Sequence, residues 1–451
     1  MSATNTQPRR LRTVVTGWTR NSSIALVANA GGSSLVRFAS NLVLSRLLAP
    51  EAFGVVLFIT SIQFVMALLS ETGIGAFIIR SEKGNAPHVL DTVWTISALR
   101  GLALALIGVV IAPFVAPLLG QGEYTTVLQV SALTFLIAGL RSPAANTQRR
   151  ERKDYYNSLV EFGVFVLTTV LTLLLAWWLR SYWGLILGTI GGSAIGTVAS
   201  YVCYKGSWRR LRIDRDVAME LWRFSRFIAA SSALTIVIVQ FDKFFIVGSM
   251  PMEVVGLYSM AWSLAMMPEK LVVQFSRRVF YPEVAHQIRQ GPATPRTYHH
   301  PIRVIRPLVG FVCGGAVTFG PTFFEICFDP RYLTAGAFFS ILCVRPILAA
   351  FSRPAENMMV ALGHPRTKFT ADVMRAAYLP VAGWVSFHYF GVWGLLVAVT
   401  AVELLPILYY TVLLKRHHVF QFRREVPTLV AALAGLAIGE GMALGWDLIA
   451  G

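Results

Sequence analysis

The chain has 451 residues, of which 55% are hydrophobic and only 14% are charged. Because soluble domains carry about a quarter of charged residues, this composition excludes a soluble globular enzyme, a disordered chain and a nucleic-acid-binding protein. The 40 Lys and Arg residues against 23 Asp and Glu residues give a formal net charge of +17. In so apolar a chain, that excess predicts basic loops on the cytoplasmic side of a membrane.

The N-terminal segment carries arginines ahead of a long apolar stretch and has no signal-peptide cleavage site, so we expect a cytoplasmic start of a retained span. A spanning helix needs about 20 mostly apolar residues. Twelve stretches fit: 24–48, 53–79, 92–119, 125–147, 157–179, 183–204, 228–249, 254–275, 303–323, 333–354, 369–389 and 391–414. A thirteenth stretch, 427–449, contains Glu440 and Asp447, so whether it crosses the membrane stays open.

The loops between these stretches alternate in charge. Basic loops follow every even-numbered stretch, at 80–83, 149–153, 205–226, 277–306, 366–368 and 415–424. The loops after the odd-numbered stretches are short and carry few basic residues, as at 121–123. The positive-inside rule then predicts a cytoplasmic N-terminus and an even number of spans up to residue 414. A thirteenth span would place the C-terminus outside.

Three short motifs recur about 200 residues apart. The pairs are Glu51–Gly54 with Glu253–Gly256, Arg141–Asn146 with Arg353–Asn357, and Trp183–Ile186 with Trp393–Leu396. Six predicted spans separate the copies, and an even number preserves their orientation. We therefore expect an all-α polytopic membrane protein whose two six-helix bundles are parallel repeats around a central cavity, with a possible extra C-terminal helix.

The repeat also predicts a division of the chain into lobes. The N-terminal lobe is expected over residues 1–204, a basic cytoplasmic linker over 205–226, and the C-terminal lobe over 227–414. Residues 415–451 form a basic segment and the possible thirteenth span.

Charges inside apolar stretches each need a physical reason, because one near mid-bilayer costs roughly 2.5–3.5 kcal/mol. They are Arg37, Glu71, Arg100, Glu161, Asp242, Lys243, Glu269, Lys270, Arg345, Glu356, Asp372, Arg375 and Glu403. Many could lie near span ends or pair locally, as the neighbours Asp242 and Lys243 could. Arg37 and Arg100 have no carboxylate within one turn of their own helix, so we predict that they line a polar cavity, together with Arg345.

Arginines in a cavity indicate an anionic ligand, because the guanidinium fork matches phosphate and keeps its charge. Glu71 is close to Gly73 and Gly75, which let another backbone or a ligand approach. It could pair with an arginine, bind a coupling ion, or mark a capped break in a helix.

No motif of a catalyst is found. The sequence lacks a Walker lysine motif, GxSxG, HExxH and a paired Cys/His cluster, so we expect no cofactor and no enzyme. The cysteines show no CxxC spacing and lie in apolar stretches, which is typical of buried small hydrophobic residues. A membrane ligase or polymerase would need a large external loop, and no such loop is found.

Four segments carry a resemblance to a known family. They are Ser45–Gly54, Glu71–Arg80, Leu99–Leu102, and Gln240–Gly248 leading to Gly256–Ala261. They resemble the polysaccharide-transporter family of lipid-linked oligosaccharide flippases, within the superfamily of multidrug, oligosaccharidyl-lipid and polysaccharide exporters. The resemblance extends to about residue 414. The family commonly has twelve or fourteen spans, and the thirteenth stretch departs from that pattern.

The resemblance implies a flippase that moves undecaprenyl-diphosphate-linked repeat units to the outer leaflet by alternating access, for exopolysaccharide or O-antigen synthesis. Arg46 and Arg80 belong to the first two matching segments. The candidate substrate-binding residues are Arg37, Arg46, Arg80, Arg100 and Arg345. The candidates for ion coupling or ion pairing are Glu71, Asp242 and Lys243.

The implied setting is the bacterial inner membrane, with the N-terminus cytoplasmic. The implied partners are the lipid-diphosphate-linked oligosaccharide, membrane lipids, and a polysaccharide polymerase with its chain-length machinery, and no nucleic acid. An anion leaving a negative cytoplasm gains about 2.3 kcal/mol per charge per 100 mV. Return of the empty, positive carrier could then need Na⁺ or H⁺. The alternative is an ion-coupled multidrug exporter on the same fold, whose cavity should favour carboxylates over arginines.

Overall fold

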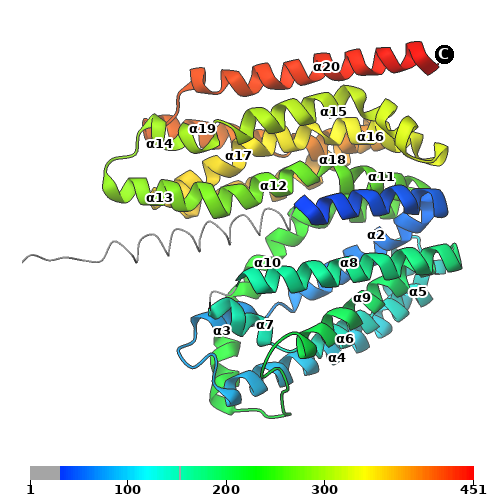
Figure 1. Cartoon of the computed structure of the whole chain (residues 1–451), viewed down its shortest axis with the longest axis vertical. Helices are drawn as coiled ribbons and strands as arrows, with labels where there is room; N and C mark the ends of the chain where they lie inside the picture. The colour runs from blue at the N-terminus through cyan, green and yellow to red at the C-terminus, as the bar shows by residue number, and fades with distance from the viewer. Residues whose placement is uncertain (1–30, 152–153, 451) are drawn as a thin grey trace, which may run out of the picture.

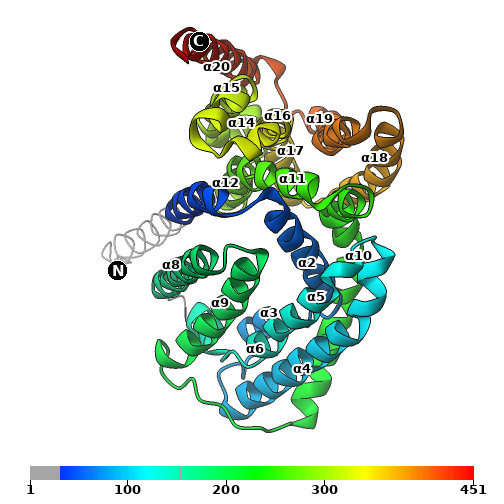
Figure 2. The same cartoon turned by 90° about the vertical axis from the view of Figure 1, so that its right-hand side faces the viewer.

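Residues 31–151 and 154–450 are described by a computed structural model, in which the regular elements are helices and none is a strand. The arginine-rich N-terminus and residues 24–30 of the first predicted span lie outside the described residues. The all-α prediction is therefore confirmed. Figures 1 and 2 show α3–α9 gathered towards one end of the long axis and α12–α20 towards the other.

We call residues 31–202 the first half and 215–450 the second half of the chain. The first half contains a helix over 31–47, then α2 (Pro50–Leu69), α3 (Ile74–Arg80), α4 (Pro87–Leu118), α5 (Thr125–Ser131), α6 (Leu133–Gly139), α7 (Ala144–Arg150), α8 (Asp154–Leu179) and α9 (Tyr182–Val202). The second half contains α10 (Arg215–Ser249), α11 (Met252–Ala265), α12 (Met267–Phe275), α13 (Tyr281–Gln290), α14 (Pro295–Ile302), α15 (Ile305–Cys327), α16 (Leu333–Leu342), α17 (Val344–Ala361), α18 (Arg366–Ala401), α19 (Leu404–Arg416) and α20 (Val426–Ala450).

Eight segments of the described chain are long and apolar enough to cross a membrane, or nine if the bent α5–α7 run is one span. One of them, Arg366–Arg416, holds two predicted spans. They are separated at Gly391, whose φ of 59° and ψ of −144° interrupt the helix. A left-handed φ is accessible to glycine at little cost, which explains the turn at the boundary predicted there.

The uncertain thirteenth stretch is a full helix. α20 is among the segments that could cross a membrane, and it runs alongside α15 at the edge of the molecule (Figure 1). The two helices touch backbone to backbone: a Cβ added at Gly435 would lie 2.2 Å from the carbonyl oxygen of Phe311, and one at Gly314 would lie 2.4 Å from that of Ala432. Small residues permit such close packing in membranes, where apolar burial supplies little attraction between helices.

The repeat motifs of the two halves meet each other. A Cβ at Gly54 of α2 would lie 2.2 Å from the carbonyl oxygen of Met252, and one at Gly256 of α11 would lie 1.7 Å from that of Pro50. The two contacts are equivalent to each other, because in the repeat Gly54 corresponds to Gly256 and Pro50 corresponds to Met252. Reciprocal contacts of this kind are what a two-fold axis produces. The division of the chain into lobes at 205–226 stays a prediction.

A second pair of similar features occurs once in each half. Short 3₁₀ turns, Gly122–Tyr124 and Pro330–Tyr332, precede α5 and α16. The hydroxyl of Tyr124 donates to the Glu51 carboxylate at 2.8 Å, and that of Tyr332 donates to the Leu48 carbonyl at 2.9 Å. Both halves therefore hold the chain where it enters α2.

Candidate functional site

Arg37 lies where the helix of residues 31–47 passes between the two halves. Its guanidinium lies 5.5 Å from the ring centre of Phe165 on α8. On the other side, the helix is fixed to the second half by a 3.2 Å hydrogen bond from Asn41 to Ser263, and by Phe38, which stacks on Phe323. Arg37 is exposed, as an arginine available to a ligand would be.

Lys270 of α12 is the second cation at this place. It is exposed, and close enough to Arg37 for the two charges to repel each other. Within the described part of the chain, neither forms an ion pair with a carboxylate. Two cations therefore come together here, one from each half, with the charge of Glu269 acting on Lys270 alone, and such an arrangement attracts an anion. We call Arg37 and Lys270 the inter-half cation pair.

Arg345 belongs to a different environment. It is buried on α17, where its Nε donates to Glu269 at 3.2 Å and its guanidinium lies 5.1 Å from the ring centre of Trp262. Lys243 lies 4.7 Å from the same ring and 3.3 Å from Asp242. The hydroxyl of Tyr258 donates a short hydrogen bond to Asp242. Arg345, Asp242 and Lys243 are thus brought together, each with an opposite charge beside it.

The network continues from Glu269 into the interior of the second half. Arg353 of α17 donates to Glu269 at 3.3 Å and to Glu403 at 2.8 Å. Glu403, which has no exposed surface, also accepts from Arg375 of α18 at 2.9 Å. Its remaining members are Glu356, Lys368 and Asp372. The buried network therefore balances five cations with five carboxylates, as burial in a low dielectric demands.

Arg100 and Glu71 meet at the end of α2. The guanidinium of Arg100 donates to the Ala67 carbonyl at 2.9 Å and to the Ser70 hydroxyl at 3.0 Å, and it interacts favourably with the charge of Glu71. Glu71 accepts from the backbone N–H of Gly73, whose φ is 62°. This is the geometry of a capped break between α2 and α3, which the glycine spacing had indicated as one alternative.

The two remaining predicted arginines lie elsewhere. Arg46 is exposed, and it lies near Asp329, which belongs to the turn that precedes α16. Arg80 is exposed at the end of α3, with its guanidinium 5.9 Å from the ring centre of Phe224. The predicted substrate-binding arginines therefore have contacts in several different parts of the structure. Lys270 and Arg353 were left out of the predicted set. Glu269 and Lys270 are neighbours of opposite charge on adjacent faces of one helix, and this pattern could have indicated Lys270.

A second buried cluster ties α14 and α15 to the segment before α20. Nη1 of Arg306 donates to both oxygens of Glu425, at 2.6 and 2.5 Å, and its Nε donates to the Ala350 carbonyl. His299 lies 3.3 Å from Glu425 through Nδ1, and its Nε2 accepts from the backbone N–H of Gln421. Burial, with the charge of Arg306, lowers the pKa of His299 to about 4. The neutral Nδ1–H tautomer satisfies both contacts, so we take the Glu425 contact as a hydrogen bond rather than an ion pair.

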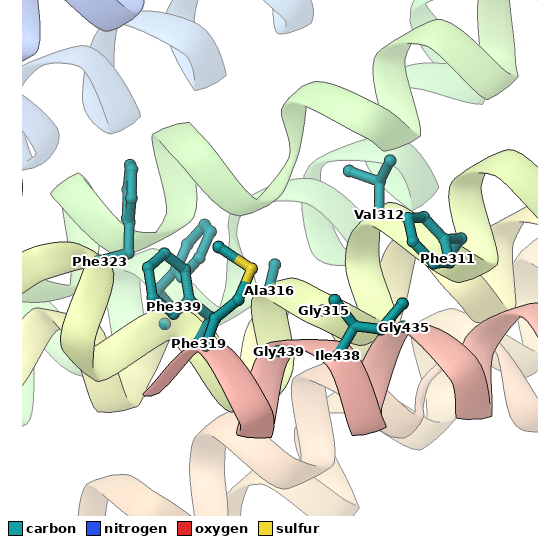
Figure 3. Close-up of a pocket in the computed structure, with 12 residues that line it drawn as sticks. Phe311, Val312, Gly315, Ala316, Phe319, Phe323, Phe339, Gly435, Ile438 and Gly439 are labelled. Atoms are coloured by element: carbon teal, nitrogen blue, oxygen red, sulfur yellow. The ribbon is translucent and has the colours of Figure 1, made fainter. Parts of the chain in front are cut away.

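An apolar groove of about 290 Å³ lies between α15, α16 and α20. Figure 3 shows Phe319, Phe323 and Phe339 grouped at one end, and Phe311 at the other. Glycines between them leave the space open. Phe323 also stacks on Phe38, the neighbour of Arg37, so the groove reaches the helix that carries Arg37.

The described residues include no group of three or more His, Cys, Asp or Glu side chains placed to hold a metal ion. The apolar helices pack closely through glycines and leave exposed cations between the two halves, which defines a polytopic helical membrane fold.

Comparison with solved structures agrees with this class. The fold matches a lipid II flippase, MurJ, in an inward closed conformation, with a TM-score of 0.69 and 11% identity over 95% of this chain and 99% of that one. It also matches an inward-facing multidrug-resistance MATE family transporter of the MOP superfamily, with a TM-score of 0.65 and 14% identity over 85% of this chain and 95% of that one. At such identities, these likenesses show the fold.

The sequence pattern of the polysaccharide biosynthesis protein family matches residues 43–334. The chain therefore belongs to that family, and its fold is similar to that of a transporter described as a member of the MOP superfamily. A protein of Klebsiella pneumoniae described as an uncharacterized membrane protein in the cps region is 19% identical over 358 residues, which are 78% of this chain and 72% of that protein. The predicted family is confirmed.

Proposed function

We propose that the protein is a flippase for lipid-diphosphate-linked oligosaccharide repeat units, moving them from the cytoplasmic to the outer leaflet by alternating access. The observation that carries this proposal is the inter-half cation pair. Arg37 and Lys270 come from different halves, are exposed, and lie near enough for their charges to repel, and neither forms a described ion pair with a carboxylate. A diphosphate placed between them would relieve their repulsion and link the two halves.

The apolar groove supports a substrate with a hydrocarbon tail. It is lined by phenylalanines and glycines, and its end contacts Phe38 beside Arg37. An isoprenoid chain in this groove would keep its apolar surface out of the sugar path, while its phosphates reach the cation pair. A soluble organic cation would gain nothing from the pair, because like charges repel.

The reciprocal contact of α2 and α11 supports alternating access. Pro50 and Gly54 meet Met252 and Gly256 through their backbones, so the halves are closed against each other there. Release of substrate on that side requires the contact to separate. An anion leaving a negative interior is driven by about 2.3 kcal/mol per charge per 100 mV, and we propose that Na⁺ or H⁺ assists the return step. A polysaccharide polymerase with its chain-length machinery would then use the product.

The test uses a strain deleted for this gene and complemented with variants. Arg37→Ala and Lys270→Ala should each slow transfer about 10- to 150-fold, the value of one charge-assisted hydrogen bond. Lipid-linked oligosaccharide should then accumulate in the inner leaflet. Arg278→Ala is the matched control, because Arg278 is an exposed cation outside the pair. Normal surface polysaccharide in both pair variants would refute the assignment.

An ion-coupled multidrug exporter is the second candidate, favoured by the similarity to MATE family transporters. The same variants separate the two functions. Increased sensitivity to cationic drugs with unchanged polysaccharide would support the exporter, whereas lost polysaccharide with unchanged drug sensitivity supports the flippase.

A further inference from the structure

The segment between α9 and α10 is held in an extended course along the first turns of α4. The backbone N–H groups of three alternate residues donate to α4: Arg210 to Asp91 at 3.4 Å, Arg212 to Thr95 at 3.1 Å, and Asp214 to Thr92 at 3.0 Å. The guanidinium of Arg209 lies 3.7 Å from Asp91. We call residues 205–223, which include the first turns of α10, the basic strap. Its backbone has a fixed place, so its outward side chains form a defined surface.

That surface is strongly apolar although it joins two membrane bundles outside their spans. Trp208 is 81% exposed and Leu211 is 79% exposed, and on α10 Trp222 is 69% exposed. The opposite face of α10 is anchored, because Val217 and Leu221 are buried against α3 and α4. The helix is thus fixed by its inner face, and Trp222 projects from its outer face.

The strap is also basic. Residues 205–223 hold six Lys or Arg residues and three Asp or Glu residues. One of the acids, Asp214, caps the N-terminus of α10. Arg210, Arg212, Arg215 and Arg223 are exposed among the apolar side chains. Interleaved arginines cannot enter hydrocarbon cheaply, and exposed tryptophans are costly in water. The membrane–water interface suits both.

We propose that the basic strap lies in the headgroup layer of the leaflet that faces the basic loops, and binds the phosphates of anionic phospholipids. The tryptophans and Leu211 enter the interface, while Arg210 and Arg212 contact the headgroups. Each arginine near an anionic surface strengthens such binding about fivefold. Because the strap is hydrogen-bonded to α4 and continues into α10, anionic lipid is a ligand of the connection between the two halves.

The test places a nitrobenzoxadiazole probe on the full-length protein in lipid nanodiscs, where both faces are accessible. Leu211→Cys carries the probe in a background with Cys203→Ser and Cys327→Ser, the two cysteines that are not buried. Glu123→Cys, in an exposed loop after α4, carries the control probe. In phosphatidylcholine discs, the Leu211 probe should emit to the blue of the control, and added phosphatidylglycerol should shift it further.

Arg210→Gln together with Arg212→Gln should remove the response to phosphatidylglycerol, lowering the affinity for this lipid about fivefold per arginine. The variant with both Arg277→Gln and Arg278→Gln is the charge-matched control, and it should keep the response to phosphatidylglycerol. If the Leu211 probe emits at the same wavelength as the Glu123 probe in both lipids, the proposal is overturned, and the strap is left as a surface for a soluble protein. A blue-shifted emission that ignores phosphatidylglycerol overturns the assignment to anionic lipid.

Discussion

A side chain at Gly256 would collide with the backbone of α2. Its Cβ would lie 1.7 Å from the Pro50 carbonyl oxygen, whereas an ordinary contact begins at 3.4 Å. The shortfall of about 1.7 Å falls on backbone atoms, which cannot swing aside, so α11 and α2 must move apart. Overpacking of this kind costs about 1–3 kcal/mol, which is roughly a 5- to 150-fold change in a conformational equilibrium.

Gly256→Ala should therefore disfavour the conformation in which the two halves are closed at this contact. Spin labels on Glu123→Cys, exposed in the 3₁₀ turn after α4, and on Tyr389→Cys, exposed just before the break of α18 at Gly391, report the separation by double electron–electron resonance. The distance distribution should move to longer values. Gly54→Ala should act in the same direction but less strongly, because its Cβ would lie 2.2 Å from the nearest oxygen.

The matched control is Gly163→Ala on α8, where a Cβ would meet nothing within 4 Å. This variant should keep the parental distances and transport rate. If Gly256→Ala behaves like Gly163→Ala in both measurements, the glycine contact does not hold the halves together, and the reasoning fails.

Two further outcomes follow from the buried clusters. Glu403→Gln should lower the free energy of unfolding by about 3–5 kcal/mol, because Arg353 and Arg375 would keep buried charges without their shared carboxylate; a thermal midpoint in detergent equal to that of the parent would contradict this. His299 has a pKa lowered to about 4 by burial, below its unfolded value of about 6.5. Its contribution to stability should therefore be full above about pH 6.5 and decline as the pH falls towards 4. Thermal midpoints measured across that range should show this slope, and His299→Gln should reduce it; an unchanged slope in the variant would assign it to other groups.

Much of the helical order followed from the sequence. The boundary between the stretches 369–389 and 391–414 followed from hydropathy, and Gly73 and Gly75 indicated the break after Glu71 as one of three alternatives. In the structure a glycine with positive φ stands at both places, Gly391 and Gly73, since left-handed backbone favours glycine. α20 could not be decided from Glu440 and Asp447 alone. The reason is that its packing depends on the contact of Gly435 with α15, and hydropathy carries no information on contacts between helices.

The charged residues were harder to place. The sequence left open whether Asp242 and Lys243 form an ion pair, and the structure shows them 3.3 Å apart. Arg345, by contrast, was expected in a polar cavity, and its described partner is Glu269, 76 positions earlier in the chain. Local spacing predicts pairs on one helix, but it carries no information on partners from another.

By itself, the sequence determined that this is a helical membrane protein, where its apolar stretches lie, and that its motifs repeat. These properties depend on consecutive residues and on the water–hydrocarbon partition of each stretch. Only the tertiary structure decided which cations are balanced and which are not. It joins Arg353 to Glu403 across 50 positions, but leaves Arg37 and Lys270 close enough to repel each other, with no described ion pair to a carboxylate. Helix packing makes that choice, because a buried charge must find its partner wherever the fold brings one.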